Sequence, residues 1–174
     1  MSNHEGAGGR VTVGERAPDF VLPAQSGEPV RLSDLLQRGS VVLYFYPKDN
    51  SAGCTAESCA FRDSYAVFTE AGATVVGISS DSVASHERFA GRHRLPFLLL
   101  SDAGGAVRKL YGVPRTLGIL PGRVTYVIDR QGLIRHMFTG QLAATRHVQE
   151  ALRMLRTMQD NTPEAPAERA PTTE

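Results

Sequence analysis

An apolar run at positions 41–46 ends at Pro47, and a helical pattern begins a few residues later at Cys54. A short, continuously apolar run is typical of a strand buried on both faces, and proline interrupts such a strand. Positions 54, 58, 61, 65 and 68 then recur with the spacing of one helix face. The sequence therefore predicts a buried strand, a loop and a helix whose first turn carries Cys54 on its core-facing side.

Strand-like and helix-like segments alternate along the rest of the chain. The expected strands cover residues 41–46, 74–79, 96–100, 124–128 and 133–138, and the expected helices begin at residue 54, at a cap formed by Asp81 or Ser82, at residue 104 and at residue 145. A turn at Gln131 and Gly132 joins the last two strands into a hairpin. This order predicts an α/β fold with a central mixed β-sheet flanked by helices.

The length of 174 residues suits one domain, which we place at residues 11–158. Residues 1–10 are polar and rich in glycine, and residues 159–174 are rich in proline, alanine and glutamate. Neither end has an apolar face to bury, so both are expected to be disordered.

The composition argues against nucleic-acid and membrane partners. The formal net charge is +1 and no dense block of Lys or Arg occurs, so no nucleic-acid partner is expected. No leader-like or membrane-spanning apolar run is visible, so we expect a cytoplasmic protein without a membrane partner. The chain has 2 cysteines, too few for a disulfide scaffold, which favours a thiol or redox role.

Cys54 is the candidate nucleophile, because the amides of a helix start stabilise a thiolate. Cys59 follows five residues later, which places the two Cα atoms about 8 to 9 Å apart in an intact helix. A disulfide requires less than about 7 Å, so this pair can bond only if the first helical turns unwind. The spacing is neither the C-x-x-C of thiol oxidoreductases nor half of a paired zinc motif. Cys59 is therefore either a packed thiol or a redox partner of Cys54.

These residues resemble a known family. The run Pro47-x-x-x-Ser51-x-x-Cys54 is similar to the peroxiredoxin signature Pro-x-x-x-Thr/Ser-x-x-Cys, and Cys54-Thr55-x-Glu57-x-Cys59 resembles the Q-type branch, also called bacterioferritin comigratory protein. The likeness covers nearly everything between the two ends, through the segments 17–20, 79–86, 95–102 and 123–129. The chain differs from the branch at Ser51, where threonine is usual, and at Ala52, where proline is usual.

The resemblance implies a thioredoxin-like fold and thiol-dependent reduction of hydrogen peroxide and organic hydroperoxides. It implies that Cys54 is the peroxidatic cysteine and Cys59 the resolving cysteine, with Pro47, Ser51 and Arg123 forming the pocket. In these roles Arg123 stabilises the thiolate, and the Ser51 hydroxyl positions the peroxide.

The same resemblance implies an intramolecular disulfide that thioredoxin or a similar dithiol protein reduces, no metal, flavin or haem cofactor, and a monomer. Two other functions stay open: a thiol–disulfide oxidoreductase acting on proteins, and a non-enzymatic redox sensor or chaperone. Glu57 is interpreted as a structural acid favoured by the helix dipole, and His86 and His93 as solvated residues of a polar helix.

Overall fold

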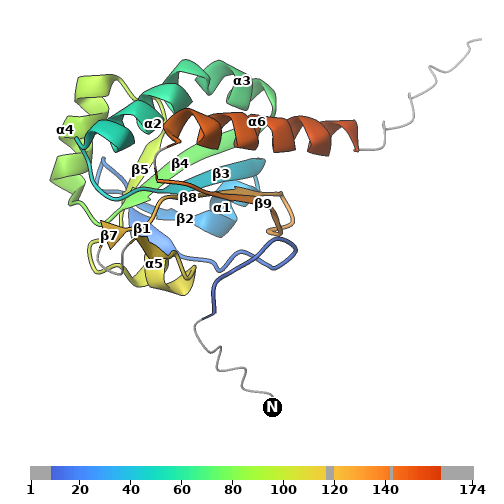
Figure 1. The fold of residues 1–174 in the computed structure, drawn as a ribbon, viewed down its shortest axis with the longest axis horizontal. Helices are drawn as coiled ribbons and strands as arrows, with labels where there is room; N and C mark the ends of the chain where they lie inside the picture. The colour runs from blue at the N-terminus through green and yellow to red at the C-terminus, as the bar shows by residue number, and fades with distance from the viewer. Residues whose placement is uncertain (1–8, 117–119, 142, 162–174) are drawn as a thin grey trace, which may run out of the picture.

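A five-stranded mixed sheet forms the centre of the molecule, and helices cover both of its faces (Figure 1). The computed structural model describes residues 9–116, 120–141 and 143–161. Its elements in chain order are β1 (Val21–Pro23), β2 (Pro29–Arg31), α1 (Leu32–Leu36), β3 (Ser40–Phe45), α2 (Ala52–Asp63), α3 (Tyr65–Glu70), β4 (Ala73–Ser79), α4 (Val83–His93), β5 (Leu98–Ser101), α5 (Ala106–Leu110), β6 (Arg115–Thr116), β7 (Leu120–Pro121), β8 (Val124–Ile128), β9 (Ile134–Thr139) and α6 (Ala144–Asp160).

The strand order of the central sheet is β5-β4-β3-β8-β9. β3, β4 and β5 run parallel to one another, whereas β8 is antiparallel to both β3 and β9. The short strands β1 and β2, and β6 and β7, form two separate antiparallel pairs. This arrangement confirms the expected α/β fold with a mixed sheet. It also puts the carboxyl end of β3, which leads into α2, beside the start of β8 at Phe45 and Val124.

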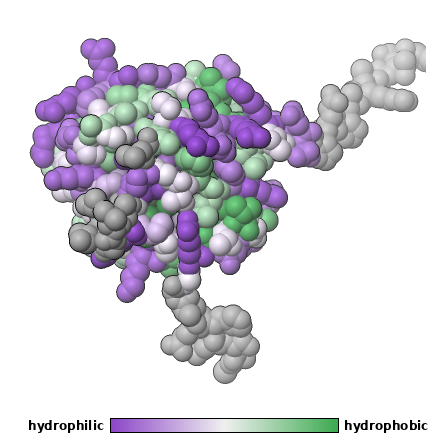
Figure 2. Space-filling view, in the orientation of Figure 1, coloured by the Kyte–Doolittle hydropathy of each residue, from purple (hydrophilic) through white to green (hydrophobic). Residues whose placement is uncertain are grey.

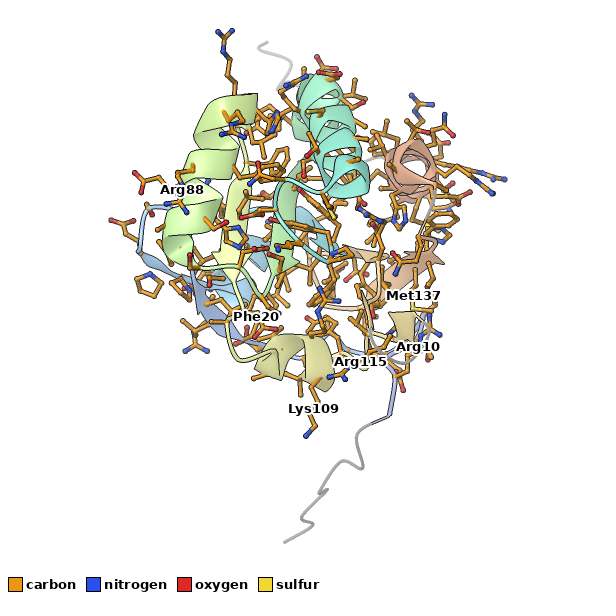
Figure 3. All side chains as sticks on the ribbon, turned by 60° about the vertical axis from the view of Figure 1, so that its left-hand side comes forward. Arg10, Phe20, Arg88, Lys109, Arg115 and Met137 are labelled. Atoms are coloured by element: carbon orange, nitrogen blue, oxygen red, sulfur yellow. The ribbon has the colours of Figure 1, made fainter. Side chains whose placement is uncertain are left out.

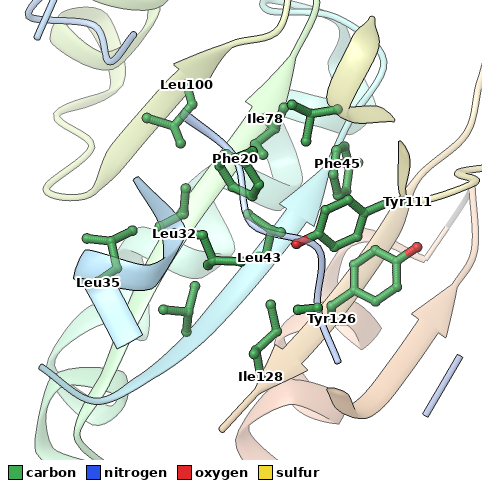
Figure 4. Packing of buried hydrophobic residues seen from close by; sticks show 14 of the residues in the cluster. Phe20, Leu32, Leu35, Leu43, Phe45, Ile78, Leu100, Tyr111, Tyr126 and Ile128 are labelled. Atoms are coloured by element: carbon green, nitrogen blue, oxygen red, sulfur yellow. The ribbon is translucent and has the colours of Figure 1, made fainter. Parts of the chain in front are cut away.

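Successive residues of β3 enter two different cores, which explains the continuous apolar run. Val41, Leu43 and Phe45 belong to the core beneath α1 and α5, part of which Figure 4 shows. Val42 and Tyr44 belong to the core beneath α2, α3, α4 and α6. All five side chains are 0% exposed, as expected for a central strand with helices on both faces.

The α2 helix lies between α4 and α6 on the second face of the sheet (Figure 3). The predicted continuous helical face breaks at Ser64, where the backbone leaves the α-helical region (φ −100°, ψ 6°) and α3 begins. Cys54, Ser58, Phe61 and Phe68 are nevertheless buried, so the predicted core-facing stripe is correct except at the half-buried Tyr65.

The ends of the chain differ from the expectation at both termini. Arg10, assigned to the disordered N-terminal segment, donates from Nη2 to Thr139 Oγ1 at 2.8 Å. Gln159 and Asp160, assigned to a disordered tail, belong to α6. The remainder of that tail, residues 162–174, and the N-terminal residues 1–8 lie outside the described residues. Within the part of the chain that the structure describes, no helix is both long and apolar enough to cross a membrane.

Polar and apolar side chains are interspersed over the face shown in Figure 2. The exposed large hydrophobic residues among those described are Val13, Val21, Val67 and Leu110, which lie in separate segments of the chain. Single exposed hydrophobic residues of this kind do not define a contact surface.

Candidate active site

The loop between β3 and α2 places Cys54 in the first turn of the helix. Ser51 is the N-cap residue, with an extended backbone (φ −70°, ψ 147°), and its hydroxyl accepts a 3.4 Å hydrogen bond from the Cys54 amide. The same hydroxyl donates to the Lys48 carbonyl at 3.1 Å, so it connects the loop to the helix start. The remaining free amides of the first turn favour negative charge at this position.

Arg123, the residue before β8, contacts Cys54. Its Nη2 atom donates to the Cys54 Sγ atom at 3.2 Å, and both side chains are buried, at 3% and 0% exposed. A Cβ atom on Gly53 would lie 3.1 Å from Nη2, so the missing side chain at Gly53 leaves room for the guanidinium. A buried sulfur beside a permanent cation is stabilised as the thiolate.

Glu57 shares the same guanidinium. It lies one turn after Cys54, is 0% exposed, and forms an ion pair with Arg123 Nη1. Burial raises the pKa of Glu57 to about 7, and the neighbouring Arg123 opposes this rise. Among the described residues, Glu57 Oε1 and Arg123 Nε have no hydrogen-bond partner. Glu57 is therefore a buried member of the site, whereas the sequence interpretation treated it as a structural acid of the helix start.

An aromatic contact fixes the middle of α2 on the sheet. The Tyr44 hydroxyl hydrogen-bonds Ser58 Oγ at 3.0 Å, and the Tyr44 ring stacks on Phe61 with centroids 4.6 Å apart. A Cβ atom on Gly77 of β4 would approach the Tyr44 ring to 2.7 Å, so glycine is required there. This contact holds the part of α2 that follows Cys54.

A buried polar network anchors the loop before Cys54. The Asp49 carboxylate accepts hydrogen bonds from the Tyr46 hydroxyl at 2.6 Å and from Ser85 at 2.8 Å, and contacts His86 Nδ1 at 2.8 Å. His86 Nε2 lies 3.1 Å from the Leu100 carbonyl. His86 is 0% exposed, so the expectation of a solvated side chain is wrong.

Pro47 lies in this loop and is half-buried. The residue before it is held from the other side of the sheet, because Arg108 Nη2 donates to the Tyr46 carbonyl at 2.7 Å. The loop is thus tied at Tyr46 and at Asp49, with Pro47 between them. The rigid ring of Pro47 adds no N–H donor to this part of the loop.

Cys59 lies on the same intact helix as Cys54, and both cysteines are free thiols. Its side chain is half-buried, and Sγ lies 4.0 Å from Nδ1 of His93, the last residue of α4. Because α2 is helical from Ala52 to Asp63, the two sulfur atoms cannot bond without local unwinding. His93 is half-buried, in contrast to the solvated side chain expected.

Ser51 contacts the Cys54 amide and Arg123 contacts the Cys54 sulfur, and Pro47 lies in the adjoining loop. Within the described ranges, no group of three or more His, Cys, Asp or Glu residues could hold a metal ion. A thiol held beside an arginine at a helix start, on a thioredoxin-like fold, defines a thiol-based redox enzyme.

Comparison with known proteins gives the family. The sequence model of the AhpC/TSA family matches residues 13–137, and the chain belongs to this family. The chloroplastic peroxiredoxin Q of Sedum lineare is 49% identical over 150 residues, spanning 86% of this chain and 80% of that protein. The resemblance to Q-type peroxiredoxins is therefore confirmed, and the chain is a thiol-dependent peroxidase.

Solved structures support the same conclusion. The crystal structure of the peroxidoxin BcpB from Mycobacterium tuberculosis is 42% identical with a TM-score of 0.79, covering 84% of this chain and 97% of that one. A structure of the Xanthomonas campestris bacterioferritin comigratory protein, described in terms of its alkyl peroxide reduction activity, is 27% identical with a TM-score of 0.71 and covers 80% and 91% of the two chains. These similarities confirm the thioredoxin-like fold.

One expectation is contradicted by the relatives. The similar plant proteins from rice, Sedum lineare and Arabidopsis thaliana are all named chloroplastic. The expected cytoplasmic location is therefore wrong. It was inferred from the absence of an apolar leader, a pattern that detects secretory signals but not the polar segments that direct proteins to plastids.

Proposed function

We propose that Cys54 is the peroxidatic cysteine of this peroxidase and Cys59 its resolving cysteine. The contact between Arg123 Nη2 and Cys54 Sγ, at 3.2 Å in the first turn of α2, is the observation that carries this assignment. It distinguishes the two thiols, because among the described residues no guanidinium donates a hydrogen bond to Cys59 Sγ, which lies a turn further along α2 beside His93. Only one of the two sulfurs is thus held as a buried nucleophile.

The first step is attack of the Cys54 thiolate on the terminal oxygen of a hydroperoxide. The S–O bond forms as the O–O bond breaks, giving Cys54 sulfenic acid and an alkoxide or hydroxide that is protonated to alcohol or water. Arg123 stabilises the thiolate and can donate to the peroxide oxygens. The Ser51 hydroxyl, which contacts the Cys54 amide, holds the pocket edge, and Pro47 limits access of water to the sulfur.

The second step is attack of the Cys59 thiol on the sulfenic sulfur, which forms the Cys54–Cys59 disulfide and releases water. The helical separation of about 8 to 9 Å requires the first turns of α2 to unwind. Unwinding at a helix end costs far less than global unfolding, so the domain can remain folded.

A dithiol protein of the thioredoxin type then reduces the disulfide, and the two electrons for each turnover come from its thiols. Hydrogen peroxide and alkyl hydroperoxides are the proposed substrates, because the Xanthomonas campestris relative is described by its alkyl peroxide reduction activity. We propose that the enzyme acts as a monomer, which size-exclusion chromatography with light scattering tests.

The experiment is peroxide consumption with thioredoxin and its reductase by the wild-type enzyme and by two nearly isosteric variants. Cys54→Ser should lose all turnover while keeping the fold. Cys59→Ser should stop once its Cys54 is oxidised, without catalytic turnover, because the variant forms no intramolecular disulfide for thioredoxin to reduce. Undiminished turnover of Cys54→Ser would overturn the assignment. Insulin reduction without peroxide consumption would instead indicate a protein oxidoreductase, and oxidation without turnover a redox sensor.

A further inference from the structure

We propose that His93 is a catalytic residue of the resolving step, accepting the proton of the Cys59 thiol as that sulfur attacks Cys54 sulfenic acid. The inference rests on the proposed role of Cys59 and extends it. A thiol is a poor nucleophile until it loses its proton, and the buried cation that serves Cys54 is not shared with Cys59. The imidazole is the group that the structure places against the second sulfur.

The geometry suits a proton transfer between α2 and α4. Cys59 Sγ and His93 Nδ1 are 4.0 Å apart, a long S–H···N contact between a half-buried thiol and a half-buried imidazole. α2 lies between α4 and α6, so this face of α2 meets the end of α4 (Figure 3). Proton transfer then needs the neutral tautomer of His93 that carries its hydrogen on Nε2.

Two contacts fix His93 in this position. Arg62, on the turn after Cys59, donates from Nη1 to the His93 carbonyl at 2.8 Å. The His93 ring packs edge-on against Phe89 with centroids 5.0 Å apart. Together they hold the backbone and the ring of His93 beside Cys59, so the pair is oriented by parts of α2 and α4 that lie outside the Cys54 pocket.

The groups around the pair act in opposite directions on the two charges that the proton transfer creates. His93 is the last residue of α4, where the helix dipole stabilises positive charge. The charged groups near it are Arg62, which is itself paired with Asp63 at 2.9 Å, and the exposed Arg92 and Arg94 on either side of His93. These cations stabilise the Cys59 thiolate that forms and oppose a lasting positive charge on His93, so the imidazole passes the proton on to the leaving hydroxide.

The contacts of α2 also decide which cysteine moves. Ser58 and Phe61, on either side of Cys59, are held by Tyr44 of β3. Cys54 is held mainly by Arg123 and by a long 3.4 Å capping bond, and oxidation to neutral sulfenic acid weakens the first of these. The first turns therefore unwind toward Cys59, which stays beside His93 during the attack.

The step balances without any further reactant. His93 takes the thiol proton, the Cys59 sulfur attacks the sulfenic sulfur, the S–S bond forms and the S–O bond breaks. The leaving hydroxide takes the proton back from the imidazolium and departs as water. Cys59 is oxidised and the sulfenic sulfur is reduced, and His93 ends in its starting state.

The test separates the two steps by rapid mixing with one equivalent of hydrogen peroxide. Sulfenic acid is trapped with a 1,3-diketone, and the disulfide is quantified by mass spectrometry. His93→Gln should form sulfenic acid at the wild-type rate but close the disulfide at least about tenfold more slowly near neutral pH. The deficit should shrink at high pH, where hydroxide removes the thiol proton. His136→Gln, on β9 and paired with Glu150, is the matched control and should match wild type.

A second variant keeps the proposal testable if the first is destabilised. In His93→Ala, added imidazole should restore disulfide closure in proportion to its concentration, a response that a purely structural role would not show. Closure by His93→Gln at the wild-type rate, or a deficit that is independent of both pH and imidazole, would overturn the proposal. Disulfide formation in Cys59→Ser would instead overturn the proposed role of Cys59 itself.

Discussion

The buried carboxyl group of Glu57 should make the stability of the protein fall as the pH rises through neutrality. Glu57 shares Arg123 with the Cys54 sulfur, and only one of its oxygens has a hydrogen-bond partner among the described residues. Burial raises its pKa from 4.5 to about 7, so the folded state holds this proton more tightly than the unfolded state does. The stabilising contribution is complete below the unfolded pKa and is lost as the pH rises through the folded value.

The size of the effect follows from the two pKa values. A rise from 4.5 to about 7 corresponds to about 3 kcal/mol of unfolding free energy, nearly all of it lost between about pH 4.5 and pH 8. This is a large part of the total free energy of unfolding of such a domain, which is about 5 to 15 kcal/mol. The cost arises because burial of the ionised Glu57 carboxylate outweighs its attraction to Arg123.

Urea unfolding over this pH range measures the effect. The comparison is between Cys54→Ser and the double variant Cys54→Ser with Glu57→Gln, so that the Cys54 thiol does not titrate and all other groups cancel. The difference in unfolding free energy between the two should change by about 3 kcal/mol in favour of the glutamine variant as the pH rises. Parallel curves would show that the pKa of Glu57 is the same in the folded and unfolded states, so that its ion pair with Arg123 offsets burial.

Three further predictions concern the site and its support. Arg123→Met should slow sulfenic acid formation at Cys54 by about a hundredfold at a pH where the thiol is ionised, measured by stopped-flow mixing; a wild-type rate would make the arginine structural only. Cys59→Ser should leave Cys54 sulfenic acid without a trap and so convert it to sulfinic acid under excess peroxide, detected by intact mass, whereas resistance equal to wild type would remove Cys59 from the cycle. Asp49→Asn should leave the buried His86 without its anionic partner and cost about 3 kcal/mol in urea unfolding, and a loss below about 1 kcal/mol would show that the pair does not anchor the loop.

The local sequence pattern is sufficient to predict the strands of the central sheet. The five strands of that sheet were each expected within a few residues, because a buried strand needs a continuous apolar run and its ends carry turn residues. The hairpin of β1 and β2 and the pair of β6 and β7 were not expected. Each of these strands has three residues or fewer, and β1 and β2 are only half-buried or exposed, so no apolar period is visible in them.

The site was only partly predictable, since burial of a polar residue depends on partners far away in the sequence. Cys54 and Ser51 follow from a local strand–loop–helix pattern. The sequence predicts Glu57 only as an acid of the helix start and His86 as a solvated residue, because nothing nearby in the sequence shows that Arg123 or Asp49 would meet them. The adjacency of β3 and β8 in the sheet brings Arg123 to Cys54, and this adjacency is a property of the fold rather than of any short segment.

The most direct test of the central claim is the mass of one tryptic peptide after a single oxidation. Trypsin cleaves after Lys48 and Arg62, so residues 49–62 carry both Cys54 and Cys59 in one fragment. After one equivalent of peroxide and alkylation of free thiols, this fragment should appear unalkylated and two hydrogen atoms lighter than the reduced peptide. If the oxidised protein is treated with thioredoxin and its reductase before the alkylation, the fragment should instead carry an alkyl group on both cysteines. Recovery of the fragment only as a disulfide-linked pair of copies, or with Cys59 still alkylated, would contradict the account.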